Sequence, residues 1–138
     1  VAFEVEPRFA VIFQAEHPEV EVINKAVGTS DGTIKMRFGM AHRVEDSASG
    51  SGVHEVPVID FALFLQLRFV PENLVVVKID VEGSELDLFE HLIATGAIGL
   101  IDEVFVEWHS WFVPAKARRM SAILAELSRR GIPHHFWL

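Results

Sequence analysis

The stretch that decides the fold is residues 75–85, which read VVVKIDVEGSE. Its first half is a short run of β-branched apolar residues, as a central parallel strand buried on both faces requires. Its second half places Asp80, Glu82 and Glu85 around Gly83, a residue that accepts a sharp turn without strain. Because ligands of open α/β sheets bind beyond the carboxyl ends of the strands, these carboxylates are candidates for chemistry.

A helix is predicted directly after this acidic turn. Ser84 is its expected N-cap, apolar residues recur at helical spacing over residues 86–93, and Gly96 is its expected end. Residues 103–109 (EVFVEWH) are expected to form the next strand, parallel to the first, because the helix supplies the crossover that parallel pairing needs. The two strand ends would then bring to one rim Asp80, Glu82, Glu107 and His109.

Composition narrows the class of protein. The chain has 138 residues, half of them hydrophobic, which is enough for one domain with a sizeable core. Its 20 acidic against 12 basic residues give a net charge of -8, which argues against nucleic-acid binding. The absence of cysteine excludes disulfides and thiolate metal sites. No apolar run reaches the roughly 18 uncharged residues of a membrane span, and no signal peptide is visible, so we expect a cytoplasmic protein.

The rest of the chain alternates between strand and helix patterns. Strands are predicted at residues 1–4, 20–27, 33–38, 53–59 and 132–138, and helices at residues 7–13, 61–67 and 114–127. The turn at residues 29–32 (TSDG) predicts a β-hairpin or β-extension. This alternation predicts a single α/β domain over residues 1–138, a three-layer sandwich with a mostly parallel sheet.

Three segments have two interpretations each. The helix at residues 61–69 is apolar nearly all round, which predicts either a sandwiched position or the interface of a homo-oligomer. Residues 45–52 (EDSASGSG) have the composition of a surface loop, which is either loose or a lid over a site. The aromatic residues Trp108, Trp111 and Phe112 either line an acceptor pocket or belong to the core.

The acidic turn also carries a family resemblance. Residues 78–85 (KIDVEGSE), followed by VEWH at residues 106–109, resemble the FkbM-type methyltransferase family, which has the Rossmann-like class I S-adenosylmethionine-dependent fold. The resemblance extends to the second-strand end at residues 2–4, the third-strand end at residues 26–28 and Asp60 before the short helix. It implies methyl transfer from S-adenosylmethionine to a hydroxyl of a small molecule or sugar.

The resemblance also implies a cofactor site. Glu4 would bind the ribose of S-adenosylmethionine, as carboxylates at the second strand of dinucleotide folds do. The chain at Ala26 and Val27 would lie near the adenine, and Asp80 would lie beside the methionine part and the methyl group. In the local pattern alone, Glu4 is equally a helix cap or a solvated acid.

The residues predicted to be catalytic are Asp80, Glu82 and His109. His109 is the first choice for a base because its unperturbed pKa lies near neutrality, and Asp80 or Glu82 would orient it or take that role. A solvated strand-end histidine is the alternative. Glu107 is equally a partner for Lys78 and is left out, and no metal site is assigned. A divalent-metal hydrolase site at Asp80, Glu82, Glu85 and His109 is the weaker interpretation, since the oxygens lack the dense spacing of a metal-binding loop.

Two parts of the family pattern are expected outside the chain. The family's first strand, with its glycine-rich turn, would precede Val1, and a last antiparallel strand would follow Leu138. That first strand lies between the strands ending at Glu4 and Asp80, so other residues, another subunit or direct pairing should fill its place. The alternative function is therefore a catalytically inactive methyltransferase-like interaction module.

Overall fold

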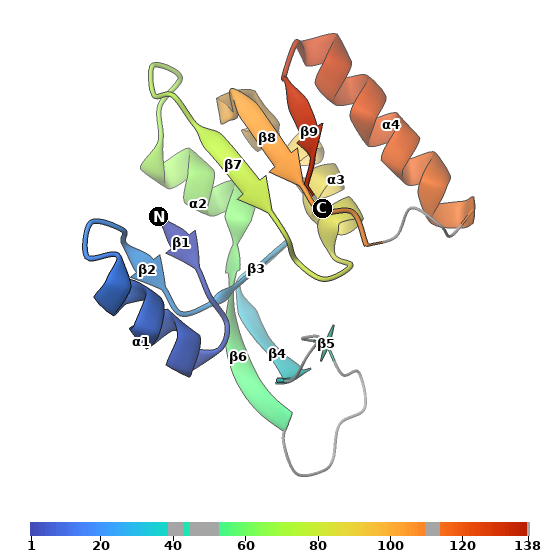
Figure 1. Ribbon diagram of the computed structural model, residues 1–138. Helices are drawn as coiled ribbons and strands as arrows, with labels where there is room; N and C mark the ends of the chain where they lie inside the picture. Colours follow the sequence, from blue (N-terminus) through green and yellow to red (C-terminus); the bar gives the residue numbers. More distant parts are fainter. Residues whose placement is uncertain (39–42, 45–52, 110–113, 138) are drawn as a thin grey trace. The chain divides into compact units, whose positions relative to one another are not determined.

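The computed structural model describes residues 1–38, 43–44, 53–109 and 114–137. It shows a mixed α/β protein with two compact units, Val1–Asp60 and Phe61–Leu138 (Figure 1). Within these residue ranges, no helix is long and apolar enough to cross a membrane.

The first unit begins with a strand, a helix and a second strand. Strand β1 (Ala2–Phe3) pairs in parallel with β2 (Val22–Ile23), and helix α1 (Pro7–Glu16) connects them. Pro7 begins the helix as predicted, since a missing N–H costs nothing at that position. The Gln14 side chain holds the helix to β2, because it donates to the Val20 carbonyl at 2.8 Å and accepts from the Val22 N–H at 3.2 Å.

The predicted strand at residues 20–27 is divided in two. Strand β3 (Ala26–Gly28) follows β2 after a break at Asn24 and Lys25. At this break the Lys25 N–H donates back to the Ile23 carbonyl at 2.9 Å, and the Asn24 side chain donates to the Glu4 carbonyl at 2.7 Å. These two bonds turn the chain out of the β1–β2 pair and into a different sheet.

The second sheet of this unit has the order β3-β6-β4-β5, built from β3, β4 (Gly32–Arg37), β5 (Arg43–Val44) and β6 (Val53–Asp60). The predicted hairpin between β3 and β4 is therefore wrong, because β6 lies between them. Strand β3 has three residues and cannot match the six of β4, whereas β6 has eight. A side chain at Gly28 would put its Cβ 2.6 Å from Val58 Cγ1, so glycine permits the close approach of β3 to β6.

The second unit is built on a parallel sheet of order β7-β8-β9, with strands β7 (Val76–Ile79), β8 (Glu103–Val106) and β9 (His134–Phe136). Helix α2 (Phe61–Arg68) precedes β7. Helix α3 (Glu85–Thr95) and the 3₁₀ helix η1 (Ala97–Leu100) connect β7 to β8, and α4 (Pro114–Arg130) connects β8 to β9 (Figure 1). Both connections are the helical crossovers that parallel pairing requires.

One face of this sheet is buried. Val77 and Ile79 of β7 are buried, but Val76 is 51% exposed, so the prediction that this strand is buried on both faces is wrong. Strand β7 is the first strand in the order of its sheet, and its alternating pattern is typical of a strand with one covered face. Residues that are fully or almost fully buried in β8 and the helices complete this core: Leu88, Phe89, Leu92, Val104, Val106, Ile123 and Leu127.

The ends of the helices follow the sequence closely. Gly96 and Gly131 adopt left-handed conformations at the ends of α3 and α4. Ser84 is the N-cap of α3 as predicted, but its side chain makes no capping hydrogen bond. The Asp87 carboxylate instead accepts a hydrogen bond from Arg119, which also donates to Glu90 and thereby joins α3 to α4.

The three ambiguous segments have different outcomes. In α2, Phe61, Ala62 and Leu65 are buried, while Leu63 and Leu67 are exposed. Trp108 is buried and stacks on Phe89 with ring centroids 5.4 Å apart, so it belongs to the core. The remaining predictions, for residues 45–52, Trp111 and Phe112, lie outside the described residues.

The buried face of α3 should dominate the stability of the second unit. Leu92 is 0% exposed and Leu67 is 79% exposed. We expect Leu92→Ala to lower the free energy of unfolding by about 2–5 kcal/mol, because it removes buried methyl groups and leaves a cavity. Leu67→Ala is the matched control and should change it by less than about 0.5 kcal/mol. Urea unfolding measures both, and equal effects would contradict this description of the core.

Candidate functional site

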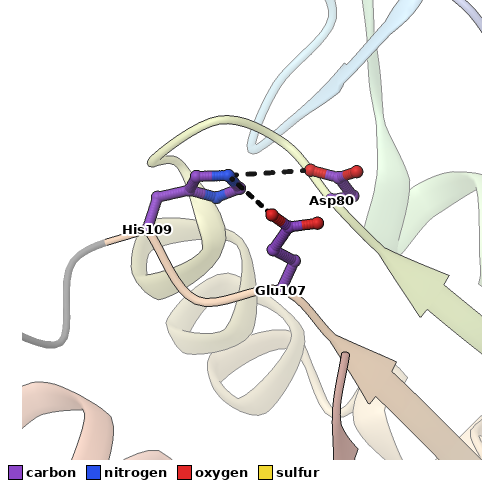
Figure 2. Close-up of side chains that lie close together, drawn as sticks. All are labelled: Asp80, Glu107 and His109. Carbon is purple, nitrogen blue, oxygen red and sulfur yellow. Dashed lines mark ion pairs between the residues drawn. The ribbon is translucent and has the colours of Figure 1, made fainter. Parts of the chain in front are cut away.

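The ends of β7 and β8 lie side by side. Ile79 pairs with Val106, and the Glu107 N–H donates to the Ile79 carbonyl at 3.0 Å, so the two strands end at the same level. Asp80 follows β7 directly, and His109 lies shortly beyond β8. His109 Nε2 is 3.9 Å from Asp80 Oδ1 (Figure 2). The structure therefore brings together the aspartate and the histidine that the sequence placed at neighbouring strand ends.

The turn between β7 and α3 positions a second carboxylate. Glu82 and Gly83 both have positive φ angles, 49° and 103°. Glycine adopts this conformation freely, whereas a non-glycine residue such as Glu82 adopts it at a cost in free energy. The turn places Glu82 Oε2 3.5 Å from His109 Nε2. Backbone strain is thus concentrated at a residue whose carboxylate faces the histidine.

A third carboxylate holds the other side of the imidazole. Glu85, the first residue of α3, is 0% exposed, and its Oε1 lies 2.8 Å from His109 Nδ1. The same oxygen accepts the Gly83 N–H at 2.8 Å. Glu85 is therefore bonded both to the acidic turn and to the histidine beyond β8. From the sequence, its place at the start of the helix that leaves the acidic turn made Glu85 a candidate for chemistry, but it was not among the three residues predicted to be catalytic.

Glu107 also lies beside the histidine. Its Oε1 is 3.6 Å from His109 Nε2. Figure 2 shows the Glu107 carboxylate pointing toward the imidazole ring. Lys78, the alternative partner proposed for Glu107, lies 3.5 Å from Asp80 Oδ2 instead, with its ammonium group over the Trp137 ring. Glu107 was expected at this rim but was not among the residues predicted to be catalytic, although its position directly after β8 matches that of Asp80 after β7. We call Asp80, Glu82, Glu85, Glu107 and His109 the strand-end cluster.

The charge of this cluster acts on His109. Partial burial disfavours the charged imidazolium and lowers its pKa, but the hydrogen bond to Glu85 and the charges of Glu85, Glu82 and Glu107 outweigh burial. The pKa of His109 is therefore raised above its ordinary value. The imidazole can act as a base, and the surrounding carboxylates favour its protonated form.

Three residues of the strand-end cluster also offer the kinds of ligand atom that bind divalent cations. Asp80, Glu107 and His109 each offer one ligand atom, and these atoms lie within 4.8 Å of one another. Carboxylate oxygens and an imidazole nitrogen could together hold a divalent cation. The same arrangement stabilises a proton on the imidazole without any metal.

Three of the four cofactor residues implied by the family resemblance, Glu4, Ala26 and Val27, lie in the first unit, whereas Asp80 belongs to the second unit. Glu4 follows β1. Its Oε1 accepts a hydrogen bond from the Glu6 N–H at 2.7 Å, and its Oε2 takes no part in this hydrogen bond. Ala26 is buried and Val27 is half-buried, both in β3. An open apolar groove of about 440 Å³ lies between α1 and β2, but it is lined by other residues: Pro7, Ala10, Val11, Gln14, Ala15, Val22 and Asn24.

Comparison with known families gives one result. A family model described as the methyltransferase FkbM domain matches residues 3–132, nearly the whole chain. No curated protein and no solved structure matches the chain.

The carboxylates around His109 predict a measurable pH dependence. We expect NMR titration to place the pKa of His109 above the ordinary value of about 6.5. A pKa that is higher in the folded than in the unfolded chain stabilises the fold fully below the unfolded pKa, and this contribution disappears as the pH rises through the folded pKa. His109→Gln should therefore destabilise the protein more at about pH 5 than at about pH 9. Equal losses at both pH values in chemical unfolding would contradict the expected coupling.

Proposed function

Since the chain belongs to the FkbM methyltransferase family, we propose that this methyltransferase moves a methyl group from S-adenosylmethionine to a hydroxyl oxygen of a small molecule or sugar. The observation that carries the proposal is the position of His109 Nε2, which faces Asp80 and Glu82 at 3.9 and 3.5 Å beyond two parallel strand ends. Ligands of α/β folds bind at that end of the strands.

The proposal includes a more specific fold. We assign the chain to the Rossmann-like class I methyltransferases, with a three-layer arrangement and a mostly parallel sheet. Support comes from the parallel order β7-β8-β9 with its helical crossovers and from the parallel pairs β1–β2 and β3–β6. The acidic turn after β7 stands where such folds place their ligand contacts.

The chemistry of the donor residues fits the cofactor. When bound, S-adenosylmethionine supplies a positively charged sulfonium whose methyl group is transferred. Asp80 would bind the methionine part, because its carboxylate is partly exposed and complements cationic groups. Glu4 would accept hydrogen bonds from the ribose hydroxyls, and the chain at Ala26 and Val27 would lie beside the adenine.

The cluster would supply the proton transfer. His109 Nε2 takes the proton of the acceptor hydroxyl, which makes the oxygen a better nucleophile. Glu82 and Asp80 face the same nitrogen and stabilise the imidazolium that forms. Holding the acceptor oxygen within reach of this nitrogen is the positioning that the site must provide.

The acceptor is a hydroxyl compound, and Trp111 and Phe112 remain the residues proposed for the wall of its pocket.

Residues 61–69 remain the proposed surface for self-association. Within that segment Leu63 and Leu67 are exposed and would make the contact.

Cofactor binding is the first test. We expect isothermal titration calorimetry of the purified protein with S-adenosylmethionine to show saturable heat. Asp80→Asn should weaken this binding, because the aspartate charge would be lost. The variant His135→Gln, in an exposed pair with Glu103, should bind like the wild type. No heat from the wild-type protein would favour the catalytically inactive interaction module instead.

Loss of the base is the second test. We expect His109→Gln to lower kcat for methyl transfer by about 10²–10⁴-fold, the usual contribution of a general base. Cofactor affinity should stay close to that of the wild type, since the proposed base acts on the acceptor. Single-turnover assays with a radiolabelled methyl donor measure the rate, with His135→Gln as the control histidine. An unchanged rate in His109→Gln would eliminate His109 as the base.

A further inference from the structure

Glu85 is an unusual residue to bury. Its side chain is 0% exposed, and its Oε2 has no hydrogen-bond partner among the residues that the structure describes. A buried carboxylate with an unsatisfied oxygen costs free energy that an apolar side chain of similar size would not cost. Glu85 is therefore poorly explained as a residue kept for stability, and its contacts suggest another role.

The contacts of Glu85 select one form of His109. An ionised carboxylate only accepts hydrogen bonds, so the Nδ1 that lies 2.8 Å from Glu85 Oε1 carries the hydrogen. In the neutral ring, Nε2 then carries the lone pair. Nε2 faces Asp80, Glu82 and Glu107 at 3.9, 3.5 and 3.6 Å, which is longer than a hydrogen bond. The nitrogen that a base needs is thus left uncommitted.

We propose that Glu85 is the positioning residue of the site: it holds His109 in the Nδ1–H tautomer, so that Nε2 faces the acceptor hydroxyl as the base. The catalytic part of this inference rests on the proposed methyl transfer, while the tautomer does not. Glu85 does not touch the acceptor and acts through His109 alone.

Glu85 also sets the shape of the turn that it faces. Its Oε1 accepts the N–H of Gly83, at the point where Glu82 and Gly83 have positive φ angles. That bond favours the conformation in which the Glu82 carboxylate reaches His109 Nε2. One oxygen atom therefore fixes both the tautomer of the base and a carboxylate beside it.

The same bond makes glutamine an informative substitution. In Glu85→Gln the amide oxygen should stay where the Gly83 N–H requires an acceptor, and it would still accept from His109 Nδ1–H. The amide NH₂ would take the place of the unpaired Oε2. Glutamine thus keeps the tautomer but removes the charge, whereas Glu85→Ala removes both.

Among the residues that the structure describes, the charged groups facing His109 come from four segments. They are Asp80 after β7, Glu82 in the turn, Glu85 on α3 and Glu107 after β8, with Lys78 of β7 3.5 Å from Asp80. Removing the Glu85 charge leaves the other three carboxylates in place. The pKa of His109 should then fall, and the acid limb of the kcat profile should move to lower pH.

The test compares wild type, Glu85→Gln, Glu85→Ala and a matched control, Glu103→Gln. Glu103 forms the other close carboxylate–histidine pair of this sheet, with Oε1 2.7 Å from His135 Nε2. We measure the His109 tautomer by ¹⁵N NMR without any substrate, the kcat against pH, and the melting temperature. Wild type and Glu85→Gln should show the Nδ1–H signature, and Glu85→Ala should lose it.

We expect kcat to fall about 10²-fold in Glu85→Ala, the cost of a misplaced catalytic group. In Glu85→Gln it should recover most of the wild-type value, with the pH shift described above, while the melting temperature stays at or above that of wild type. Glu103→Gln should leave every measurement unchanged. A wild-type tautomer and kcat in Glu85→Ala would overturn the proposal, as would a lower melting temperature in Glu85→Gln with no change in tautomer or pH profile. Absence of methyl transfer by the wild type would instead remove the proposed function, and the NMR result would still test Glu85.

Discussion

The strand-end cluster depends on the hydrogen bond between Glu85 and His109. This bond of 2.8 Å joins two residues 24 positions apart in the chain. Through the Gly83 N–H, the same carboxylate oxygen also fixes the turn that leaves β7. One atom therefore ties together the start of α3, the acidic turn and the segment beyond β8. The parallel pairing of β7 with β8 brings these segments close, and the carboxylate then determines how their side chains face.

Two local features of the cluster lower the stability of the folded protein, and apolar packing in the surrounding core offsets this loss of free energy. Glu85 is buried with one oxygen unpaired, and Glu82 has a left-handed backbone. One turn further along α3 from Glu85, Phe89 is fully buried and stacks on Trp108, which lies between Glu107 and His109 in the chain. Apolar packing of α3 thus holds both halves of the cluster. Proteins tend to break local rules of stability at functional sites while the surrounding core keeps them.

Much of this arrangement could be predicted from the sequence, because it follows from local patterns. A β-branched run, a glycine turn and helical spacing predict β7 and α3, and the rule for parallel strand ends places Asp80 near His109. The failures concern partners distant in the chain. The turn before β4 suggested pairing with β3, but the longer β6 takes that position. The composition of β7 suggested burial on both faces. This prediction failed because the same apolar residues also suit a strand with only one covered face. The role of Glu85 depends on a contact with His109 that no local pattern reveals.

A comparison of two histidines shows why geometry matters more than residue type. His135 also lies beside a carboxylate, but its Nε2 is committed to Glu103 at 2.7 Å, and both side chains are substantially exposed. Such a surface pair contributes little to stability and leaves no free Nε2 lone pair to act as a base. In His109 the other ring nitrogen, Nδ1, makes the hydrogen bond to a carboxylate. Nδ1 is committed to a buried carboxylate, and Nε2 faces three carboxylates at distances beyond a hydrogen bond. An imidazole works as a directed base only when one nitrogen is held and the other is free, and of these two pairs only the buried one meets that condition.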